Sequence, residues 1–466
     1  MGKHHLDFFM SPQSVAVIGA SRKSGDGNFN VIENMLNFGF KGNIYPVNPQ
    51  ARDIMGMPCY KDVRDIRKPI DVAIVSTPRD LVPKMVKNCA GCGIKGTIVV
   101  PQGFADADET GKALQKQLTE ISQRNGIRIL GPNTLGVVNA FSGFTSSFMP
   151  IKRQKVPVGV ICQSGIFFVG ASVFTGMMGK GIDVANGCDL GFAEALEYFG
   201  QDKDIRVIFA HIEGLPEGRR FFEVAGEVAR RKPVIALKTA KTGQGARAAS
   251  SHSGALVGRH EVFEAVFRQT GILSAGDAGE VLDGTKALLH LPPMKGNRVG
   301  VITFTGAGGI ILIDALQEQG LELAALSDKT IQTVKTLSPD WMPIHNPMDV
   351  WPAIMKNDLN TVYEKALTQV LKDPSVDGVM CIAIAPDPPE RFLDATGVIQ
   401  ETAARFPEKP VVAYLYGPNQ AAVSENLEQG GHVVSLPSLS RAARTLGALY
   451  RRGRFLKMDT ARRVAG

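Results

Sequence analysis

This sequence has no long apolar run, no hydrophobic leader and few cysteines. No apolar segment approaches the roughly 20 residues that a helix needs to cross a bilayer. The first residues, MGKHHLDFFMSPQS, lack the apolar stretch and small-residue cleavage site of a secretory signal. The 466 residues include only six scattered cysteines, as expected in a reducing compartment. We therefore expect a cytoplasmic protein that is not embedded in a membrane.

Metal ligands are also scarce. Cys89 and Cys92 form a C-x-x-C pair, but no second cysteine pair or histidine pair lies nearby to complete four zinc ligands. The pair falls at the predicted end of a helix, next to glycine stop signals, so we interpret both thiols as structural. The sequence predicts no metal site.

No block of lysine and arginine with interleaved aromatic residues occurs, although the formal net charge is +7. Nucleic acid is therefore not an expected partner. A basic balance suits a polyanionic small ligand such as a nucleotide or coenzyme A. A solvated surface that is basic without any ligand would give the same charge, so charge alone leaves the choice open.

A first unit of alternating strands and helices occupies residues 1–145. Short apolar runs predict strands at 15–18, 42–49, 71–78, 96–104 and 127–139, with amphipathic helical patterns between them. This alternation predicts a parallel sheet with helices on both faces. Each strand ends in glycine, proline or small polar residues. The carboxyl ends of strands are where open α/β sheets bind ligands.

The glycine loop after the first strand departs from the dinucleotide-binding pattern. It reads G-A-S-R-K-S-G-D-G from Gly19, and the second strand ends at Asn48–Pro49 without an acidic residue. An NAD-dependent dehydrogenase would need a ribose-binding carboxylate there, so we exclude that class. A Rossmann-like nucleotide site is still expected, because Ser21 and Arg22 suit phosphates.

A second α/β unit is predicted at residues 146–292. The strand VGVICQ leads into Ser164–Gly165 and an apolar helix, and further strands are predicted at 206–214 and 232–239.

A third unit, at 293–466, follows a Pro/Gly-rich linker. The strand RVGVITF leads into Thr305–Gly309 and an apolar helix, with further strands at 377–385 and 410–417. Both units repeat a strand, a small-residue loop and a helix, which indicates a duplicated architecture. We expect an α/β protein with an N-terminal Rossmann-like domain and two flavodoxin-like parallel α/β domains.

Both small-residue loops predict a helix that starts directly after a strand. Free backbone N–H groups and the positive end of the helix dipole make such a start a general anion site. The candidate residues are Ser164, Gly165, Thr305, Gly306, Ala307, Gly308 and Gly309. If the two units face each other, both starts could hold one phosphate. Glycine also permits tight turns with no ligand, so both interpretations remain open.

One histidine lies in an unusual setting. His252 sits in KTGQGARAASSHSGALVG, a stretch rich in small residues just before a helical pattern. A histidine that swings between sites needs an uncluttered loop, and neutral imidazole is a good nucleophile toward phosphorus. Glu213, at the strand end HIEG, is the best-placed carboxylate to hold its other ring nitrogen. A packed filler is the alternative for His252, and His211 and His345 are weaker rivals for the role.

These motifs resemble the NDP-forming acyl-CoA synthetase family, which is related to succinyl-CoA synthetase, and in particular its alpha-type subunit. The resemblance rests on VAVIGAS, VNP, STP, GPNTLG, QSG, IEGLPEGRRF and ARAASSHSGALVG, and it runs from about Ser14 to Leu456. It implies an ADP-forming acid–CoA ligase. Such an enzyme interconverts acyl-CoA, ADP and phosphate with acid, CoA and ATP through an acyl phosphate and a phosphohistidine.

The resemblance implies a role for each matching residue. His252 would be phosphorylated, Glu213 would support it, and the two small-residue loops would hold phosphate. The first unit would bind coenzyme A through Gly19, Ala20, Ser21, Arg22, Val47, Asn48, Pro49, Ser76, Thr77, Pro78 and Asn133.

Two features depart from the family. The family passes the phosphoryl group to ADP on an ATP-grasp domain, and we find none within the 466 residues. We therefore expect a heteromer with an ATP-grasp beta subunit that holds ADP or ATP and Mg²⁺. A small carboxylic acid or acyl-CoA and phosphate would be the other ligands. The loop DVANGCD at 183–189 also differs from the Ser-Leu-Gly-Asn-like loop of related proteins, although Asn186 and Asp189 are retained.

A second class of function remains, a CoA- or acyl-CoA-binding regulatory or scaffold protein without catalysis. A binding module needs neither His252 nor Glu213 nor the two phosphate loops, so their presence favours the ligase. CoA binding fits both classes, and phosphoryl transfer separates them.

Overall fold

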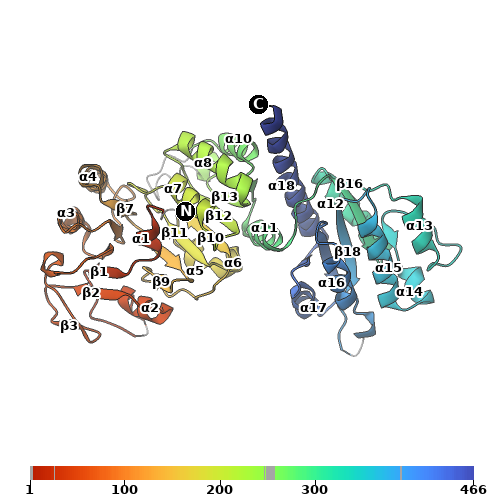
Figure 1. Cartoon of the computed structure of the whole chain (residues 1–466), viewed down its shortest axis with the longest axis horizontal. Helices are drawn as coiled ribbons and strands as arrows, with labels where there is room; N and C mark the ends of the chain where they lie inside the picture. The colour runs from red at the N-terminus through yellow and green to blue at the C-terminus, as the bar shows by residue number, and fades with distance from the viewer. Residues whose placement is uncertain (1–3, 26, 246, 248–257, 389–390, 466) are drawn as a thin grey trace. The chain divides into compact units, whose positions relative to one another are not determined.

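The computed structural model describes residues 4–25, 27–245, 247, 258–388 and 391–465. The chain forms two units, Met1–Val281 and Leu282–Gly466. In Figure 1 the first unit runs from red to green and the second from blue-green to blue. Among the described helices, none is long and apolar enough to cross a membrane.

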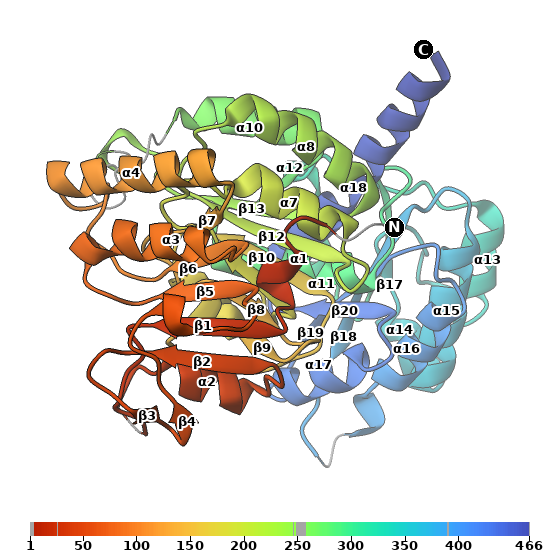
Figure 2. The same cartoon turned by 60° about the vertical axis from the view of Figure 1, so that its left-hand side comes forward.

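The first sheet is parallel throughout and has the strand order β2-β1-β5-β6-β7, which Figure 2 shows as successive neighbours. Its strands are β1 (Ser14–Ile18), β2 (Asn43–Val47), β5 (Val72–Val75), β6 (Gly96–Val99) and β7 (Arg128–Leu130). Strands β1, β5 and β6 are buried on both faces, which explains their unbroken apolar sequence. The predicted parallel sheet is confirmed.

Three helices connect the strands of this sheet, namely α2 (Val31–Phe38), α3 (Val82–Gly91) and α4 (Glu109–Asn125). The chain crosses from β1 to β2 in one direction and from β5 to β7 in the other. Right-handed crossovers therefore place α2 on one face and α3 and α4 on the opposite face. The order changes direction between β1 and β5, so the ligand-binding crevice of such a sheet is expected at their carboxyl ends.

The fifth predicted strand, 127–139, is two strands in two different sheets. β7 ends at Leu130, and β8 (Val137–Asn139) pairs antiparallel with β11 (Lys180–Asp183) of the second sheet. Between β7 and β8 the backbone is left-handed at Gly131, Asn133 and Gly136, with φ values of 96°, 64° and 80°. An extended strand excludes this conformation, so the prediction of one strand is wrong. β9 (Phe144–Thr145) continues the antiparallel edge.

The second sheet has the order β14-β13-β12-β10-β11-β8-β9. Its remaining strands are β10 (Val158–Cys162), β12 (Val207–Ile212), β13 (Val234–Lys238) and β14 (Leu273–Ser274). The helices of this region are α7 (Phe192–Gln201), α8 (Gly218–Arg231) and α10 (His260–Thr270). Sequence reasoning did not predict β11 or α7.

The apolar helix predicted after Ser164–Gly165 is two single turns. These are α5 (Ile166–Val169) and α6 (Ala171–Phe174), and Gly170 separates them. The Gly170 N–H donates to the Ile166 carbonyl at 2.7 Å, which closes the first turn. The prediction of one continuous helix is wrong, and the loop therefore lacks the dipole of a long helix.

The third sheet has the order β16-β15-β18-β19-β20, with β17 paired to β15. Its strands are β15 (Arg298–Thr303), β16 (Glu322–Leu323), β17 (Met348–Asp349), β18 (Gly378–Ile384), β19 (Val411–Tyr416) and β20 (Val433–Leu436). Counted in chain order, the main strands of all three sheets run 2-1-3-4-5, so the duplicated architecture is confirmed. Helix α12 (Gly306–Glu318) begins four residues before the predicted apolar run, with Thr305 at its N-cap.

The unit boundary precedes most of helix α11 (Ala278–His290). From Leu282 onward, α11 belongs to the C-terminal unit, where Asp283 accepts two hydrogen bonds of 2.6 Å from Arg441. The remaining elements are α1 (Asp7–Met10), β3 (Asp53–Ile54), β4 (Met57–Pro58), η1 (Val63–Asp65), η2 (Arg79–Leu81), α13 (Asp328–Lys335), α14 (Trp351–Lys356), α15 (Leu359–Lys372), η3 (Arg391–Leu393), α16 (Thr396–Ala404), α17 (Gln420–Glu428) and α18 (Leu439–Ala465).

Candidate active site

Three of the predicted coenzyme A loops meet at the carboxyl edge of the first sheet. The N–H groups of Gly19 and Ala20 donate to the Val47 carbonyl at 2.9 and 3.3 Å, and the Asn48 amide donates to the Ala20 carbonyl at 3.0 Å. The Ser76 N–H donates to the Ile18 carbonyl at 2.8 Å. The loops that follow β1, β2 and β5 are therefore hydrogen-bonded into one surface.

Glycine is required at the centre of this surface. Gly19 has φ of 82°, and a Cβ atom there would lie 2.5 Å from the Ser76 carbonyl oxygen. The close approach of the two loops leaves no room for a side chain. The Thr77 hydroxyl oxygen beside Gly19 is buried and has no hydrogen-bond partner among the described residues. Arg22, which follows Ser21 in the first loop, is exposed.

The predicted thioester segment joins the first sheet to the second. The Asn133 N–H donates to the Pro101 carbonyl at 2.9 Å. The N–H groups of Asn186 and Cys188 donate to the carbonyls of Pro132 and Gly131 at 3.3 and 3.0 Å. The segment around Asn133 therefore contacts the loop 183–189, which follows β11.

Gln163 brings the phosphate loop and Glu213 together at the carboxyl edge of the second sheet. Its side-chain oxygen accepts the N–H groups of Glu213 and Gly214 at 2.6 and 3.0 Å, and its amide donates to the Gly214 carbonyl at 3.0 Å. Ser164 and Gly165 follow Gln163 directly. The ends of β10 and β12 are thus tied together at the switch point of this sheet.

Glu213 is buried with an unsatisfied carboxylate oxygen. Its residue exposure is 9%, and its Oε2 atom has no hydrogen-bond partner among the described residues. An unpartnered buried carboxylate oxygen is costly, so a donor is expected to meet it in the working protein. The predicted donor, His252, lies outside the described residues.

A buried lysine that the sequence analysis missed lies behind Glu213. Lys238 is 1% exposed, and its ammonium donates to the Glu213 carbonyl at 2.9 Å and to the Thr239 carbonyl. Burial lowers the pKa of Lys238 to about 8, while the nearby Glu213 raises it. The signal was available, because a lysine at the end of the apolar strand VIALK has to find partners inside the fold.

The rival histidines are less suited to phosphoryl transfer. His211 is 2% exposed, stacks on Phe167 with ring centroids 3.9 Å apart, and contacts the Thr239 hydroxyl at 3.2 Å. Burial and, to a smaller extent, the charge of Lys238 together lower the pKa of His211 to about 3. It is therefore a neutral, enclosed ring. His345 is exposed in the C-terminal unit.

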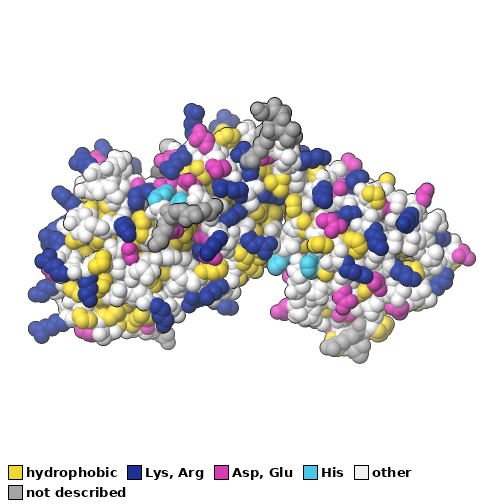
Figure 3. Space-filling model, in the orientation of Figure 1, with side chains coloured by type: hydrophobic (Ala, Val, Ile, Leu, Met, Phe, Trp, Pro, Cys, Tyr) yellow, Lys and Arg dark blue, Asp and Glu magenta, His cyan; other side chains and the backbone are white. Residues whose placement is uncertain are grey.

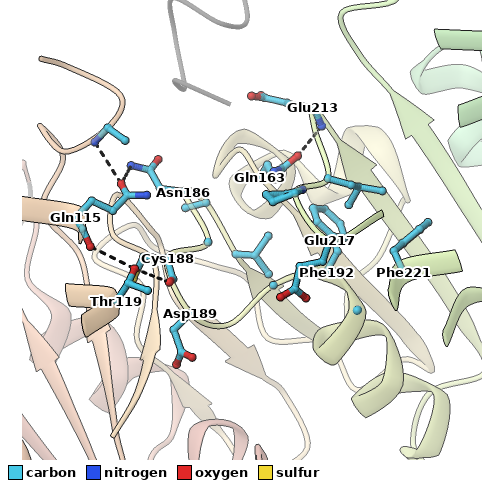
Figure 4. A pocket seen from close by; sticks show the side chains of 18 of the residues that line it. Gln115, Thr119, Gln163, Asn186, Cys188, Asp189, Phe192, Glu213, Glu217 and Phe221 are labelled. Atoms are coloured by element: carbon cyan, nitrogen blue, oxygen red, sulfur yellow. Dashed lines mark hydrogen bonds between the residues drawn. The ribbon is translucent and has the colours of Figure 1, made fainter. Parts of the chain in front are cut away.

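A cavity of about 510 Å³ opens between α4, the loop 183–189 and the start of α8 in the N-terminal unit (Figure 4). Gln115, Thr119 and Asn186 lie on one side, and Phe192, Phe221 and Glu213 lie on the other. Asn186 donates to Gln115 at 3.1 Å and to Asp106 at 2.7 Å, and Thr119 donates to the Cys188 carbonyl at 2.9 Å. Gln163 and Glu213, from the carboxyl edge of the second sheet, are also part of the cavity wall.

The second phosphate loop lies in the C-terminal unit. Thr305 precedes α12, and its N–H donates to the Thr303 hydroxyl at 3.0 Å. Gly306, Ala307, Gly308 and Gly309 form the first turn of α12, so their N–H groups point out of the helix start. The carboxylate of Asp349 lies beside this turn, 3.4 Å from where a Cβ atom of Gly306 would be. The two phosphate loops thus belong to different units.

Within the described part of the chain, no group of three or more His, Cys, Asp or Glu residues could hold a metal ion. All six cysteines are free, with Cys89 buried in α3 and Cys92 exposed after it. On the face drawn in Figure 3, Lys and Arg side chains are spread over the surface among Asp and Glu.

Three family models match successive parts of the chain. They are a CoA binding domain at residues 13–140, a succinyl-CoA ligase like flavodoxin domain at 155–288 and a ligase-CoA domain at 299–458.

Named relatives match almost the whole chain. The alpha subunit of acetate–CoA ligase (ADP-forming) II from Pyrococcus furiosus is 34% identical over 455 residues, 96% of each chain. Acetate–CoA ligase (ADP-forming) II from Archaeoglobus fulgidus is 37% identical over 79% of this chain, but the match spans 56% of that longer protein.

The fold also matches a solved relative. The structure of dinucleotide-forming acetyl-coenzyme A synthetase 1 from Candidatus Korarchaeum cryptofilum, in complex with phosphate and ADP, superposes with a TM-score of 0.86 at 30% identity, covering 97% of this chain and 98% of that one. The loops, the switch points and these matches agree, and the chain belongs to the family of the ADP-forming acetate–CoA ligase alpha subunits.

Proposed function

We propose that this chain is the alpha subunit of an ADP-forming acid–CoA ligase, which interconverts acyl-CoA, ADP and phosphate with acid, CoA and ATP. The observation that supports this most directly is the edge of the second sheet. There Gln163 ties the loop Ser164–Gly165 to the buried Glu213, whose Oε2 atom has no partner among the described residues.

Coenzyme A would lie across the edge of the first sheet. The loops at Gly19–Ser21, Val47–Pro49 and Ser76–Pro78 form one hydrogen-bonded surface, and Arg22 offers a charged donor for phosphate. The thioester end would reach Asn133, which contacts the loop 183–189 through the adjoining Gly131–Pro132 carbonyls. The same surface therefore leads from the nucleotide end of CoA toward Glu213.

The chemistry would proceed in two transfers on this chain. A phosphate oxygen attacks the thioester carbonyl carbon, the C–S bond breaks, and CoA leaves as a thiol after taking a proton. A ring nitrogen of His252 then attacks the phosphorus of the acyl phosphate, and the carboxylate leaves as the P–O bond breaks. Glu213 would accept the N–H of the opposite ring nitrogen, which fixes the tautomer and stabilises the cationic ring.

Phosphate would be held by backbone N–H groups. Ser164–Gly165 is followed by one helical turn, so it offers local N–H donors but little dipole. The thirteen-residue helix α12 offers the stronger site at Thr305–Gly309. The convergence of the two loops on one phosphate stays a prediction.

A partner would complete the reaction. We propose a beta subunit with an ATP-grasp domain, which would hold ADP and Mg²⁺ and accept the phosphoryl group from His252.

We also retain the division of the chain into domains at 1–145, 146–292 and 293–466 as a proposal, and a cytoplasmic location stays a prediction.

The deciding experiment is phosphorylation of the purified chain without a partner. The chain is incubated with radiolabelled phosphate and a panel of acyl-CoA thioesters, and protein-bound label is tested for the acid lability and base stability of phosphohistidine. We expect label in the wild type and in His345→Asn, the matched control, and none in His252→Asn.

Either outcome has a clear meaning. Label that depends on acyl-CoA and on His252 supports the ligase. Tight CoA binding without label from any acyl-CoA, also after addition of an ATP-grasp subunit from a relative, would contradict catalysis and favour the CoA-binding regulatory class.

A further inference from the structure

The contacts of the Lys238 ammonium group account for all three of its donors. Lys238 is the last residue of β13 and lies beside Ile212 in the parallel register of β12 and β13. Its Nζ atom donates to the carbonyls of Glu213 and Thr239, and it lies 4.8 Å from the centroid of the Phe263 ring on α10. An aromatic face attracts a cation and takes the place of a third acceptor. The ammonium group therefore joins the ends of two strands to a helix.

These contacts involve the parts of the chain that flank His252. Thr239 follows β13 and leads toward the stretch that contains His252, and Phe263 belongs to the helix that follows this stretch. Gly258 lies against the same ring, since a Cβ atom there would be 2.9 Å from the Cε2 atom of Phe263. His252 itself lies outside the described residues. One buried ammonium group therefore contacts the residue before this stretch and the ring that packs at its end.

The charge of the Lys238 ammonium group is only partly offset, because no carboxylate among the described residues is hydrogen-bonded to it. Burial lowers the pKa of Lys238 to about 8; the nearby Glu213, at the end of β12, raises this pKa, and the charge of Lys241, after β13, lowers it. His211, also on β12, is neutral near pH 7. Helix α10 contributes the uncharged ring of Phe263. The ammonium form therefore predominates at pH 7, and the neutral amine predominates above about pH 8.

We propose that Lys238 is a positioning residue for the transfer of the phosphoryl group to His252. As an ammonium group it would fix the Glu213 main chain and the chain on both sides of His252. Its charge would offset that of the Glu213 carboxylate and of the incoming phosphoryl group. The neutral amine would lose this charge and the attraction to the aromatic ring. The inference rests on the proposed function, because it takes His252 to be the phosphoryl acceptor.

Lys232 provides a matched control at the opposite end of the same strand. It lies two residues before β13, and its ammonium group also donates to two main-chain carbonyls, those of Phe199 and Asp202. Burial lowers the pKa of Lys232 as well. These contacts lie at the amino edge of the second sheet, at the other end from Glu213. Lys232→Met therefore removes the same kind of contact and leaves the carboxyl edge intact.

The test measures the initial rate at which the full chain is labelled between pH 6.5 and pH 9.5. The label comes from radiolabelled acetyl phosphate, or from radiolabelled phosphate and the acyl-CoA that labels fastest, and His252→Asn gives the background. We expect the wild-type rate to fall about tenfold between pH 7 and pH 9, because a pKa of about 8 reduces the ammonium form from about nine-tenths to about one-tenth of the molecules.

The variants should differ in rate and in pH profile. Lys238→Met should be labelled at least about tenfold more slowly than the wild type at pH 7, with no further fall toward pH 9. Lys238→Arg keeps its charge throughout this range, so its rate should not fall between pH 7 and pH 9. Lys232→Met should have the wild-type rate and the wild-type pH profile.

The outcomes separate the two proposals. If Lys238→Met is labelled at the wild-type rate or follows the wild-type pH profile, the inference is overturned and the ligase proposal stands. The same holds if Lys232→Met slows labelling as much as Lys238→Met, because the loss would then come from lower stability of the unit. No label in the wild type from any of these donors would contradict both proposals. Should Lys238→Met not fold, the profile of Lys238→Arg decides, and a wild-type fall toward pH 9 would overturn the inference.

Discussion

The burial of the His211 ring can be tested through the pH dependence of the free energy of unfolding of the N-terminal unit. The ring is enclosed on β12, and its pKa of about 3 lies well below the ordinary value of about 6.5. The unfolded chain therefore binds a proton below pH 6.5 that the folded chain does not bind until near pH 3. The free energy of unfolding is therefore unaffected by His211 above pH 6.5, and it decreases as the pH falls below that value.

The magnitude follows from the two pKa values. At pH 5, about 1.5 pH units below the pKa of the unfolded ring, the ring is protonated in the unfolded chain and neutral in the folded chain. This difference lowers the free energy of unfolding by about 2 kcal/mol relative to pH 7.5. His211→Gln removes the titrating group but can still hydrogen-bond to Thr239. Packing lost against Phe167 is the same at both pH values, so it cancels in the double difference.

The assay is urea unfolding at pH 7.5 and pH 5 for wild type and His211→Gln. Both tryptophans, Trp341 and Trp351, belong to the C-terminal unit, so fluorescence follows that unit and serves as an internal control. A circular-dichroism transition without a fluorescence counterpart reports the N-terminal unit. We expect the stability difference between the two pH values to shrink by about 2 kcal/mol in His211→Gln. An unchanged pH dependence would show that the ring titrates normally, and the reasoning would be refuted.

Three further predictions concern the candidate site. Glu213→Gln should reduce labelling of the phosphoryl acceptor about tenfold while CoA affinity stays the same, because it removes about 1.5 kcal/mol of charge-assisted support; a parallel loss of CoA affinity would contradict this role. Ser21→Ala combined with Arg22→Ala should weaken CoA binding, measured by calorimetry, about tenfold or more without changing labelling from an acyl phosphate, and unchanged affinity would overturn the loop assignment. Gly19→Ala should lower the stability of the N-terminal unit by more than about 1 kcal/mol, because its φ is 82° and the new Cβ would meet the Ser76 carbonyl at 2.5 Å; a urea midpoint equal to the wild type would disprove that close approach.

The sequence was informative where local chemistry decides the structure. Glycine and small polar residues after apolar runs indicated where the strands of the first sheet end, and small-residue loops were predicted after β10 and β15. The lack of an acidic residue after β2 also excludes the NAD class from the sequence alone.

Long-range packing decided the rest. Gly131, Pro132 and Asn133 indicate a turn after Leu130, but nothing local predicts that the next strand, from Val137, joins the second sheet. The contact between the Asn133 segment and the loop 183–189 depends on that transfer, and so does the cavity beside Glu213. The burial of Lys238 could be predicted from its position at the end of an apolar strand. Its hydrogen bond to the Glu213 carbonyl could not, because that bond depends on how two strands are placed side by side.

The antiparallel edge formed by β8 and β9 has a practical consequence for dividing this molecule. A fragment that ends at Thr145 would carry β8 and β9 away from β11, to which β8 is paired. The remaining piece would expose a bare strand edge, a known template for aggregation, while the excised piece would keep two strands without their sheet. Expression of the CoA-binding half alone is therefore better attempted with both N-terminal sheets together, ending near Val281, than at the end of the first.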